Sequence, residues 1–343
     1  MQTKSLPLIG LIALAITPLH GQSSQPVYWS TTVPDCSSLL GETAIPVKNG
    51  SATVGYSCFV GGTFVWFAAG GVWGTSLRVA APASAAVAVN YSFYDTTGNN
   101  VSLDTTIDND QSSFASGNQA KFALFANQPA EIEILGATSD NPSYSHTADG
   151  TVFAVFLCPD AMTCASVLPQ LIYSALPTYP WSLSVPIAWD FALAKQWSAE
   201  GIDDGRTNVV SLVVYNEDVT ATSYKISVFD GDGNLAGTGT TPSIPPLSSG
   251  SVEGGTYAAL LSDLVSPLPQ GIFKVLIDGG SSLSAVEVLQ INGASATTLQ
   301  VAPDTAPATA SGVMARQKSS ERILRAQASK ELIRPLRKKS LAP

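Results

Sequence analysis

Short stretches in which apolar and polar residues alternate recur along most of this chain, and Gly, Asn, Asp or Pro separates them. This alternation, with many β-branched and aromatic residues, predicts half-buried strands because successive side chains of a strand point to opposite faces. Strands are first expected at 27–33, 53–60, 63–67, 76–80, 86–94, 121–125, 130–135 and 151–158. A second group is expected at 208–215, 223–230, 257–259, 273–277 and 284–289. No helices alternate with these strands, which favours sandwiches over a parallel α/β sheet.

One pattern occurs twice in the chain. Residues 88–99 read AVNYSFYDTTGN, and residues 223–234 read SYKISVFDGDGN. In each copy an Asp begins a turn and can accept backbone N–H bonds, and a Gly three residues later can adopt a positive φ. Each copy therefore predicts a hairpin with a three-residue loop and a glycine bulge. The repetition indicates an all-β chain with two consecutive, similar antiparallel β-sandwich domains.

These patterns divide the chain into six segments. They are a signal peptide at 1–21, an N-terminal strand segment at 22–51, a first β-sandwich at 52–165, a Pro-containing linker at 166–184, a second β-sandwich at 185–302, and a linker with a basic tail at 303–343. The signal peptide has one early Lys and an apolar stretch of 11 residues. A stretch of this length is too short to cross a bilayer as a helix, since that takes roughly 18 residues.

The C-terminal tail differs from the rest of the chain. Residues 22–312 carry 7 Lys and Arg against 24 Asp and Glu, whereas 313–343 carry 9 against 2. Residues 319–334 read SSERILRAQASKELIR and predict a short amphipathic helix that can contact an anionic surface. A disordered basic tail is the alternative. The acidic body argues against nucleic acid as a partner, because phosphate would be repelled.

Four cysteines in two local pairs indicate an oxidising compartment. Of the three possible connectivities we expect Cys36–Cys58 and Cys158–Cys164. A zinc site is disfavoured, because no Cys-x-x-Cys spacing occurs and the chain has only 2 histidines. Together with the signal peptide, the cysteines predict a secreted, periplasmic or cell-envelope protein.

A family resemblance rests on the segments that precede and contain the repeated hairpins. FAAGGVWGT at 67–75 and WSAEGIDDGRT at 197–207 each lead through a strand to another strand that ends in F/Y-D-x-x-G-N. This order resembles the repeated Ig-like β-sandwich domains of secreted bacterial proteins of unassigned function. The resemblance covers 63–99 and 197–234. It implies an Ig-like fold and export, and it transfers no catalytic residue.

Two groups of acidic residues are candidates for a catalytic or a metal-binding site. Glu131 and Glu133 alternate with Ile in one strand, so both carboxylates face the same way, as a glycosidase pair or a solvated strand face would. Asp230, Asp232 and Asn234 resemble the opening of a calcium loop, which needs hard oxygen ligands. The first hairpin forms the same turn with Thr96 and Thr97, so the turn does not require calcium.

The sequence gives little support for a sugar-binding surface of tryptophans or for a catalytic site that uses histidine. Six tryptophans can stack on sugar rings, yet most lie where core or interdomain packing is expected. His146, the one histidine of the mature chain, lies in a polar loop and has no G-x-S-x-G motif to accompany it. We therefore expect a non-catalytic scaffold, adhesion or binding protein without a cofactor. A carbohydrate-binding module and a carboxylate-pair hydrolase are the alternatives.

Overall fold

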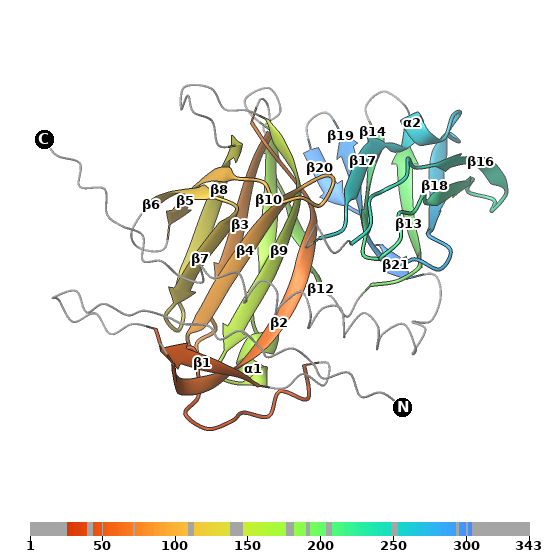
Figure 1. Cartoon of the computed structure of the whole chain (residues 1–343). Helices are drawn as coiled ribbons and strands as arrows, with labels where there is room; N and C mark the ends of the chain where they lie inside the picture. The colour runs from red at the N-terminus through yellow and green to blue at the C-terminus, as the bar shows by residue number, and fades with distance from the viewer. Residues whose placement is uncertain are drawn as a thin grey trace, which may run out of the picture.

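The structure, a computed structural model, describes residues 26–39, 44–49, 51–70, 73–108, 113–137, 147–175, 182–189, 193–203, 208–247, 253–292, 295–299 and 301–303. Nearly all regular structure in these ranges is antiparallel β-sheet. Four sheets form two sandwiches that lie next to each other (Figure 1). The expected all-β fold is confirmed.

The first sandwich consists of two six-stranded sheets. Its elements are β1 (Ile45–Asn49), β2 (Ala52–Ala69), β3 (Trp73–Ala80), β4 (Val87–Asp95), β5 (Leu103–Asp108), β6 (Ser113–Gly117), β7 (Gln119–Leu124), β8 (Pro129–Ala137), β9 (Ala148–Cys158), α1 (Ala161–Ala165), β10 (Gln170–Ala175), β11 (Ser182–Pro186) and β12 (Ala188–Trp189). One sheet has the order β1-β2-β9-β4-β7, with β12 also on β2. The other has the order β11-β10-β3-β8-β5-β6.

Alternation within the strands fills the core of this sandwich. In β4, Val87, Val89, Tyr91 and Phe93 all belong to the first core cluster. The residues between them point to the opposite face of the sheet and are also buried, some of them in two smaller apolar clusters. The facing sheet contributes Leu77 of β3 and other alternate residues to the same cluster. Because successive side chains of a strand point to opposite faces, β4 contributes to apolar packing on both faces of its sheet.

The second sandwich is smaller and contains a five-stranded and a four-stranded sheet. Its elements are β13 (Gln196–Asp203), β14 (Asn208–Asn216), β15 (Lys225–Phe229), β16 (Leu235–Thr240), β17 (Thr256–Leu260), α2 (Leu261–Leu264), β18 (Gly271–Asp278), β19 (Ser284–Asn292), β20 (Ser295–Thr298) and β21 (Ala302–Pro303). The sheet orders are β16-β15-β18-β13-β21 and β17-β14-β19-β20.

The two sandwiches repeat one strand order. The path β2-β9-β4 in the first corresponds to β13-β18-β15 in the second, and β11-β10-β3-β8 corresponds to β20-β19-β14-β17. The copies differ after the hairpin. In the second sandwich the chain stays in the same sheet as β16, whereas in the first it crosses to the other sheet as β5. The repeated sequence pattern therefore reflects a repeated architecture.

Both copies of the sequence pattern form the expected hairpin. In the first, the Asp95 N–H donates to the Asn99 carbonyl at 2.8 Å, and the Gly98 N–H donates to the Asp95 carbonyl at 2.9 Å. The equivalent bonds in the second hairpin measure 2.9 and 3.0 Å. Gly98 and Gly233 have φ angles of 83° and 85°, which side chains other than glycine adopt only with strain.

The expected cysteine pairs are both present as disulfides. Cys36–Cys58 ties the N-terminal segment to β2, and Cys158–Cys164 ties α1 to β9. Cys58 and Cys158 lie directly opposite each other in the β2–β9 ladder, so the two bridges meet at one cross-strand pair. The sequence spacing does not reveal this proximity.

The domain boundary differs from the expected one. The segment 166–184, expected to be a linker, contains β10 and the first part of β11, both of which belong to a sheet of the first sandwich. Pro169 directly precedes β10 instead of interrupting a strand, which is compatible with sheet structure. The predicted strand at 27–33 is also wrong, because only Ser30 there forms a bridge, with Tyr56. The predicted signal peptide and tail helix lie outside the described residues.

Candidate functional site

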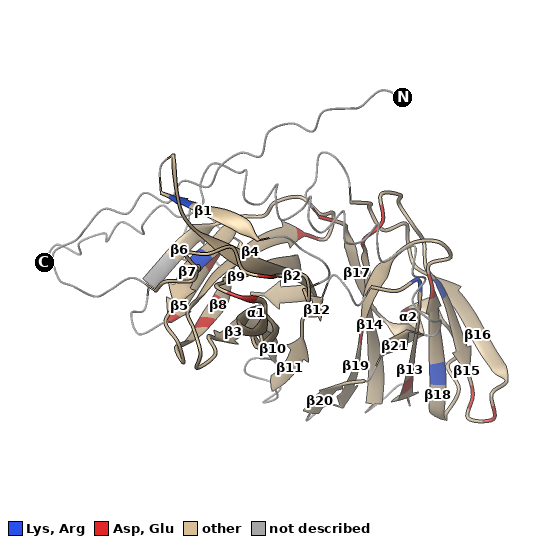
Figure 2. Cartoon of the chain, turned by 90° about the horizontal axis from the view of Figure 1, so that it is seen from below, with Lys and Arg blue, Asp and Glu red and all other residues tan. Residues whose placement is uncertain are grey.

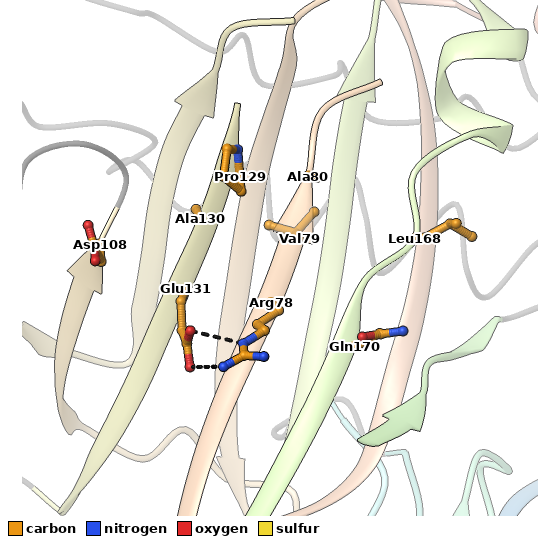
Figure 3. A pocket seen from close by; sticks show the side chains of 9 residues that line it. All are labelled: Arg78, Val79, Ala80, Asp108, Pro129, Ala130, Glu131, Leu168 and Gln170. Atoms are coloured by element: carbon orange, nitrogen blue, oxygen red, sulfur yellow. Dashed lines mark hydrogen bonds and ion pairs between the residues drawn. The ribbon is translucent and has the colours of Figure 1, made fainter. Parts of the chain in front are cut away.

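The outer face of the sheet β11-β10-β3-β8-β5-β6, which we call the open face, carries the main polar site. Asp108, Glu131, Arg78 and Gln170 lie directly opposite one another on four adjacent strands. Their side chains line a hollow of about 520 Å³, together with Leu168 and small residues at the strand ends (Figure 3). The register of the sheet therefore brings together residues that are far apart in the sequence.

Arg78 and Glu131 form a two-pronged ion pair across β3 and β8 (Figure 3). Arg78 Nε donates to Glu131 Oε2 at 2.9 Å, and the Arg78 Nη2 atom donates to Oε1 at 3.2 Å. Partial burial raises the pKa of Glu131, but the hydrogen bonds from Arg78 and Ser76 and the Arg78 charge outweigh burial and hold it below its ordinary value. Both side chains remain substantially exposed, so the pair contributes little to the stability of the fold.

Glu131 and Glu133 lie on the same face of β8, as the alternation predicts, with Ile132 and Ile134 in the core. Thr106 donates to Glu133 at 3.4 Å. A glycosidase needs one carboxyl group whose pKa is raised, so that it can act as an acid. The lowered pKa of Glu131 is the opposite of this requirement, and the ion pair with Arg78 is its cause.

The corresponding face of the second sandwich is covered by the first sandwich. There Val213, Tyr215 and Ala285 form an apolar cluster with Val65 of β2. Leu289 of β19 packs into the core cluster of the first sandwich. We call this contact surface between the sandwiches the joint. The same face of the repeated fold is thus polar and open in one copy, and apolar and covered in the other.

The first hairpin forms part of the joint. The Thr256 N–H donates to the Thr96 carbonyl at 3.0 Å, and Thr256 Oγ1 donates to the Val65 carbonyl at 2.9 Å. A Cβ atom on Gly98 would lie 2.4 Å from the Glu253 carbonyl oxygen. The backbone of the hairpin therefore packs closely against the segment that leads into β17.

Two buried glutamates lie at or near the joint, and sequence reasoning missed both. Tyr215 donates a short hydrogen bond to Glu253. Glu287 of β19 lies 3.5 Å from the Tyr173 hydroxyl of β10, which belongs to the first sandwich. The sequence signal for Glu287 is a single acidic residue within the apolar run SAVEVLQI. Such a residue usually faces solvent, and only the docking of the two copies buries it.

The calcium candidates occupy the second hairpin. Asp230 Oδ1 accepts hydrogen bonds from the backbone N–H groups of Asp232 and Asn234, at 3.0 and 2.8 Å. These bonds, the Asn234 one foremost, lower the pKa of Asp230. The carboxylate thus stabilises the turn, as Asp95 does in the first hairpin. Within the described ranges no cluster of three His, Cys, Asp or Glu side chains could hold a metal ion. Calcium binding here remains a prediction.

The tryptophans within the described ranges pack against other side chains. Trp66 contacts Trp73 and Tyr173 with ring centroids 5.8 and 5.5 Å apart, and Trp189 contacts Phe156 at 6.0 Å. Trp197 is 8% exposed and donates to Ser284. None of the described tryptophans is among the exposed large apolar residues, which weakens a sugar-stacking platform. Trp181 and His146 lie outside the described residues.

Charged residues are few on the described sheets, and most Lys and Arg stand apart from one another (Figure 2). No helix in the described ranges is long and apolar enough to cross a bilayer. No protein-family model matches the chain, and a search of curated proteins finds no match.

Proposed function

We propose that this protein is a non-catalytic binding module of the cell exterior, either secreted or attached to the envelope, and that its open face binds the partner. The sequence resembles repeated Ig-like β-sandwich domains of secreted bacterial proteins of unassigned function, and this resemblance supports the fold and the export of the protein. The second sandwich and the N-terminal segment then act as supports that hold the open face rigidly.

One observation carries this proposal. The face of the second sandwich that corresponds to the open face binds a large surface, namely the first sandwich, and it is apolar. The first sandwich presents the same face with Arg78, Glu131 and Gln170 around a hollow of about 520 Å³. A polar, hollowed face suits a hydrated ligand better than it suits another apolar protein surface.

A location outside the cytoplasm is supported by chemistry. The two disulfides are of the kind that persist in oxidising compartments. The apolar N-terminal stretch that follows Lys4 has the length of an export signal. Ligands in this setting are surface polysaccharides or other polyhydroxyl compounds, whose hydroxyl groups pair with Arg, Gln and carboxylate side chains. A carbohydrate-binding role is thus the sharper form of the proposal.

Binding to immobilised polysaccharides and to whole cells tests the proposal. The double variant Arg78→Ala/Gln170→Ala should bind at least about tenfold more weakly than wild type, because hydrogen-bonding anchors dominate binding energy. Lys225→Ala, an exposed substitution in the second sandwich, is the control and should bind normally. Absence of binding to every surface, or equal loss in both variants, would contradict the proposal. Release of sugar products that Glu131→Gln abolishes would favour the hydrolase alternative.

A further inference from the structure

The hydroxyl group of Tyr173 can donate only one hydrogen bond. It lies 2.7 Å from the Trp66 carbonyl oxygen, which has no proton, so the Tyr173 proton belongs in that bond. Glu287 Oε2 lies 3.5 Å from the same hydroxyl oxygen. Glu287 therefore faces an oxygen whose proton is already engaged, and its carboxyl group needs a proton of its own to form a favourable contact.

The other carboxyl oxygen of Glu287 has no partner in the part of the chain that the structure describes. Oε1 is buried and makes no hydrogen bond there. The residue directly opposite in β14 is Val213, which is fully buried. From β10 the titratable Tyr173 hydroxyl faces the carboxyl group, and Val65 of β2 lines the same groove as Glu287. Among the described residues no cation acts on this carboxyl group, so a buried negative charge here would be poorly stabilised.

We propose that the joint between the two sandwiches is a pH-operated lock, closed while Glu287 carries its proton and loosened when the carboxyl group ionises. The protonated group is compatible with the apolar joint, whereas the charged group must reach water. This device does not depend on what the open face binds.

The surroundings of Glu287 determine the pH at which the lock operates and the way in which it opens. Burial raises the pKa of Glu287 to about 8. A groove of about 430 Å³ runs along the joint beside β11, β12 and β19, and it includes Glu287 in its lining. Since Oε1 is buried, a small separation of the sandwiches is needed before water from the groove can hydrate it. Ionisation therefore favours a parted joint without requiring either sandwich to unfold.

Amide hydrogen exchange between about pH 6 and pH 9.5, corrected for the intrinsic pH dependence, tests the lock on the full chain. In wild type we expect protection of β19 and β10 to fall about tenfold for each pH unit up to about pH 8 and to level off above it. Protection of β15 and β18, inside the second sandwich, should not change over the same range. Glu133→Gln, an exposed glutamate of β8, is the matched control and should behave as wild type does.

Two variants separate a proton-driven lock from a merely structural contact. Glu287→Gln keeps the shape without the charge, so its joint should stay protected at every pH. Tyr173→Phe removes the hydroxyl oxygen that can accept a hydrogen bond from the protonated carboxyl group, so its transition should move to lower pH. Unchanged protection of β19 in wild type, or the same transition in Glu287→Gln, would overturn the proposal.

Should Glu287→Gln fail to fold, infrared spectroscopy of wild type replaces it. A buried protonated carboxyl group gives a carbonyl band distinct from that of carboxylates. We expect this band at neutral pH, with loss near pH 8 in step with the exchange transition. Absence of the band at neutral pH would overturn the proposal.

Discussion

The two hairpins of this protein have the same turn but different surroundings. Gly98 and Gly233 share nearly the same φ angle, and the Asp that begins each turn accepts the same backbone hydrogen bonds. The first hairpin is pressed against the second sandwich, with the Glu253 carbonyl 2.4 Å from where a Cβ on Gly98 would lie. Around Gly233 no atom lies within 4 Å of that position. Comparing the two copies therefore separates what the turn requires from what the joint requires.

Replacing each glycine by alanine gives the largest expected difference between the copies. Gly233→Ala imposes only the backbone strain of a positive φ, about 1 kcal/mol. Gly98→Ala adds a collision with backbone atoms that cannot move aside, so we expect a loss of about 4 kcal/mol. Urea unfolding of both variants measures this difference. Equal losses would mean that the first hairpin does not pack against the joint.

The disulfides provide a second contrast, since all four cysteines lie in the first sandwich and its N-terminal segment. Bridges closing longer loops restrict the unfolded chain more. The Cys36–Cys58 bridge spans 22 positions and the Cys158–Cys164 bridge spans 6, so their removal should lower the free energy of unfolding by about 3 and about 2 kcal/mol.

Thermal unfolding of Cys36→Ala/Cys58→Ala and of Cys158→Ala/Cys164→Ala checks this ranking. Hydrogen exchange under reducing conditions should show the loss in β2 and β9, with β14 and β18 less affected. A greater loss from the short bridge would indicate that the anchoring of α1, and not loop closure, governs stability here.

The third contrast is between the covered face of the second sandwich and the open face of the first. The covered face, which contains Glu287, should make the stability of the protein depend on pH. The folded pKa of Glu287, about 8, lies above the ordinary value of 4.5, so between these values the folded state binds more protons than the unfolded state. The stability that this group contributes is therefore complete below about pH 4.5 and is lost as the pH rises to about 8.

Glu287→Gln should remove this dependence and should be more stable than wild type by about 5 kcal/mol above pH 8. Denaturant midpoints measured at several pH values check the prediction. Glu133→Gln, on the open face, serves as the control, and its midpoints should follow those of wild type. Parallel curves for wild type and Glu287→Gln would contradict the assignment.

The smallest expected effect concerns the open face. Arg78 and Glu131 are 56% and 40% exposed, and ion pairs of this kind contribute little to stability. Arg78→Ala should change the free energy of unfolding by no more than about 0.5 kcal/mol. A larger loss in chemical denaturation would indicate that the open face is a structural surface and would count against its role in binding.

The sequence predicted features that depend on local chemistry. The Asp and Gly of each hairpin define a turn by themselves, so both hairpins follow from a few neighbouring residues. The placement of Glu131 and Glu133 on one face followed from strand periodicity in the same way. The cysteine pairs were also predictable, because each lies within a short stretch of chain.

Features that depend on distant segments were missed. The segment 166–184 looked like a linker because of its prolines, yet β10 and β11 complete a sheet through pairing with β3, about 100 positions earlier. The row of polar residues that runs across the open face from Asp108 to Gln170 depends on the register of four strands. The burial of Glu287 depends on one copy covering the other, and no local pattern distinguishes it from a solvated glutamate.

The pairing of β2 with β9 has a consequence for how the chain acquires its shape. Cys58 lies opposite Cys158, so a polypeptide that emerges from its N-terminus presents β2 long before the partner strand arrives. The first sheet cannot close until β9 has emerged, although β2 can pair with β1 before then. Pairing of β2 with β9 is therefore a late step in the assembly of the first sandwich.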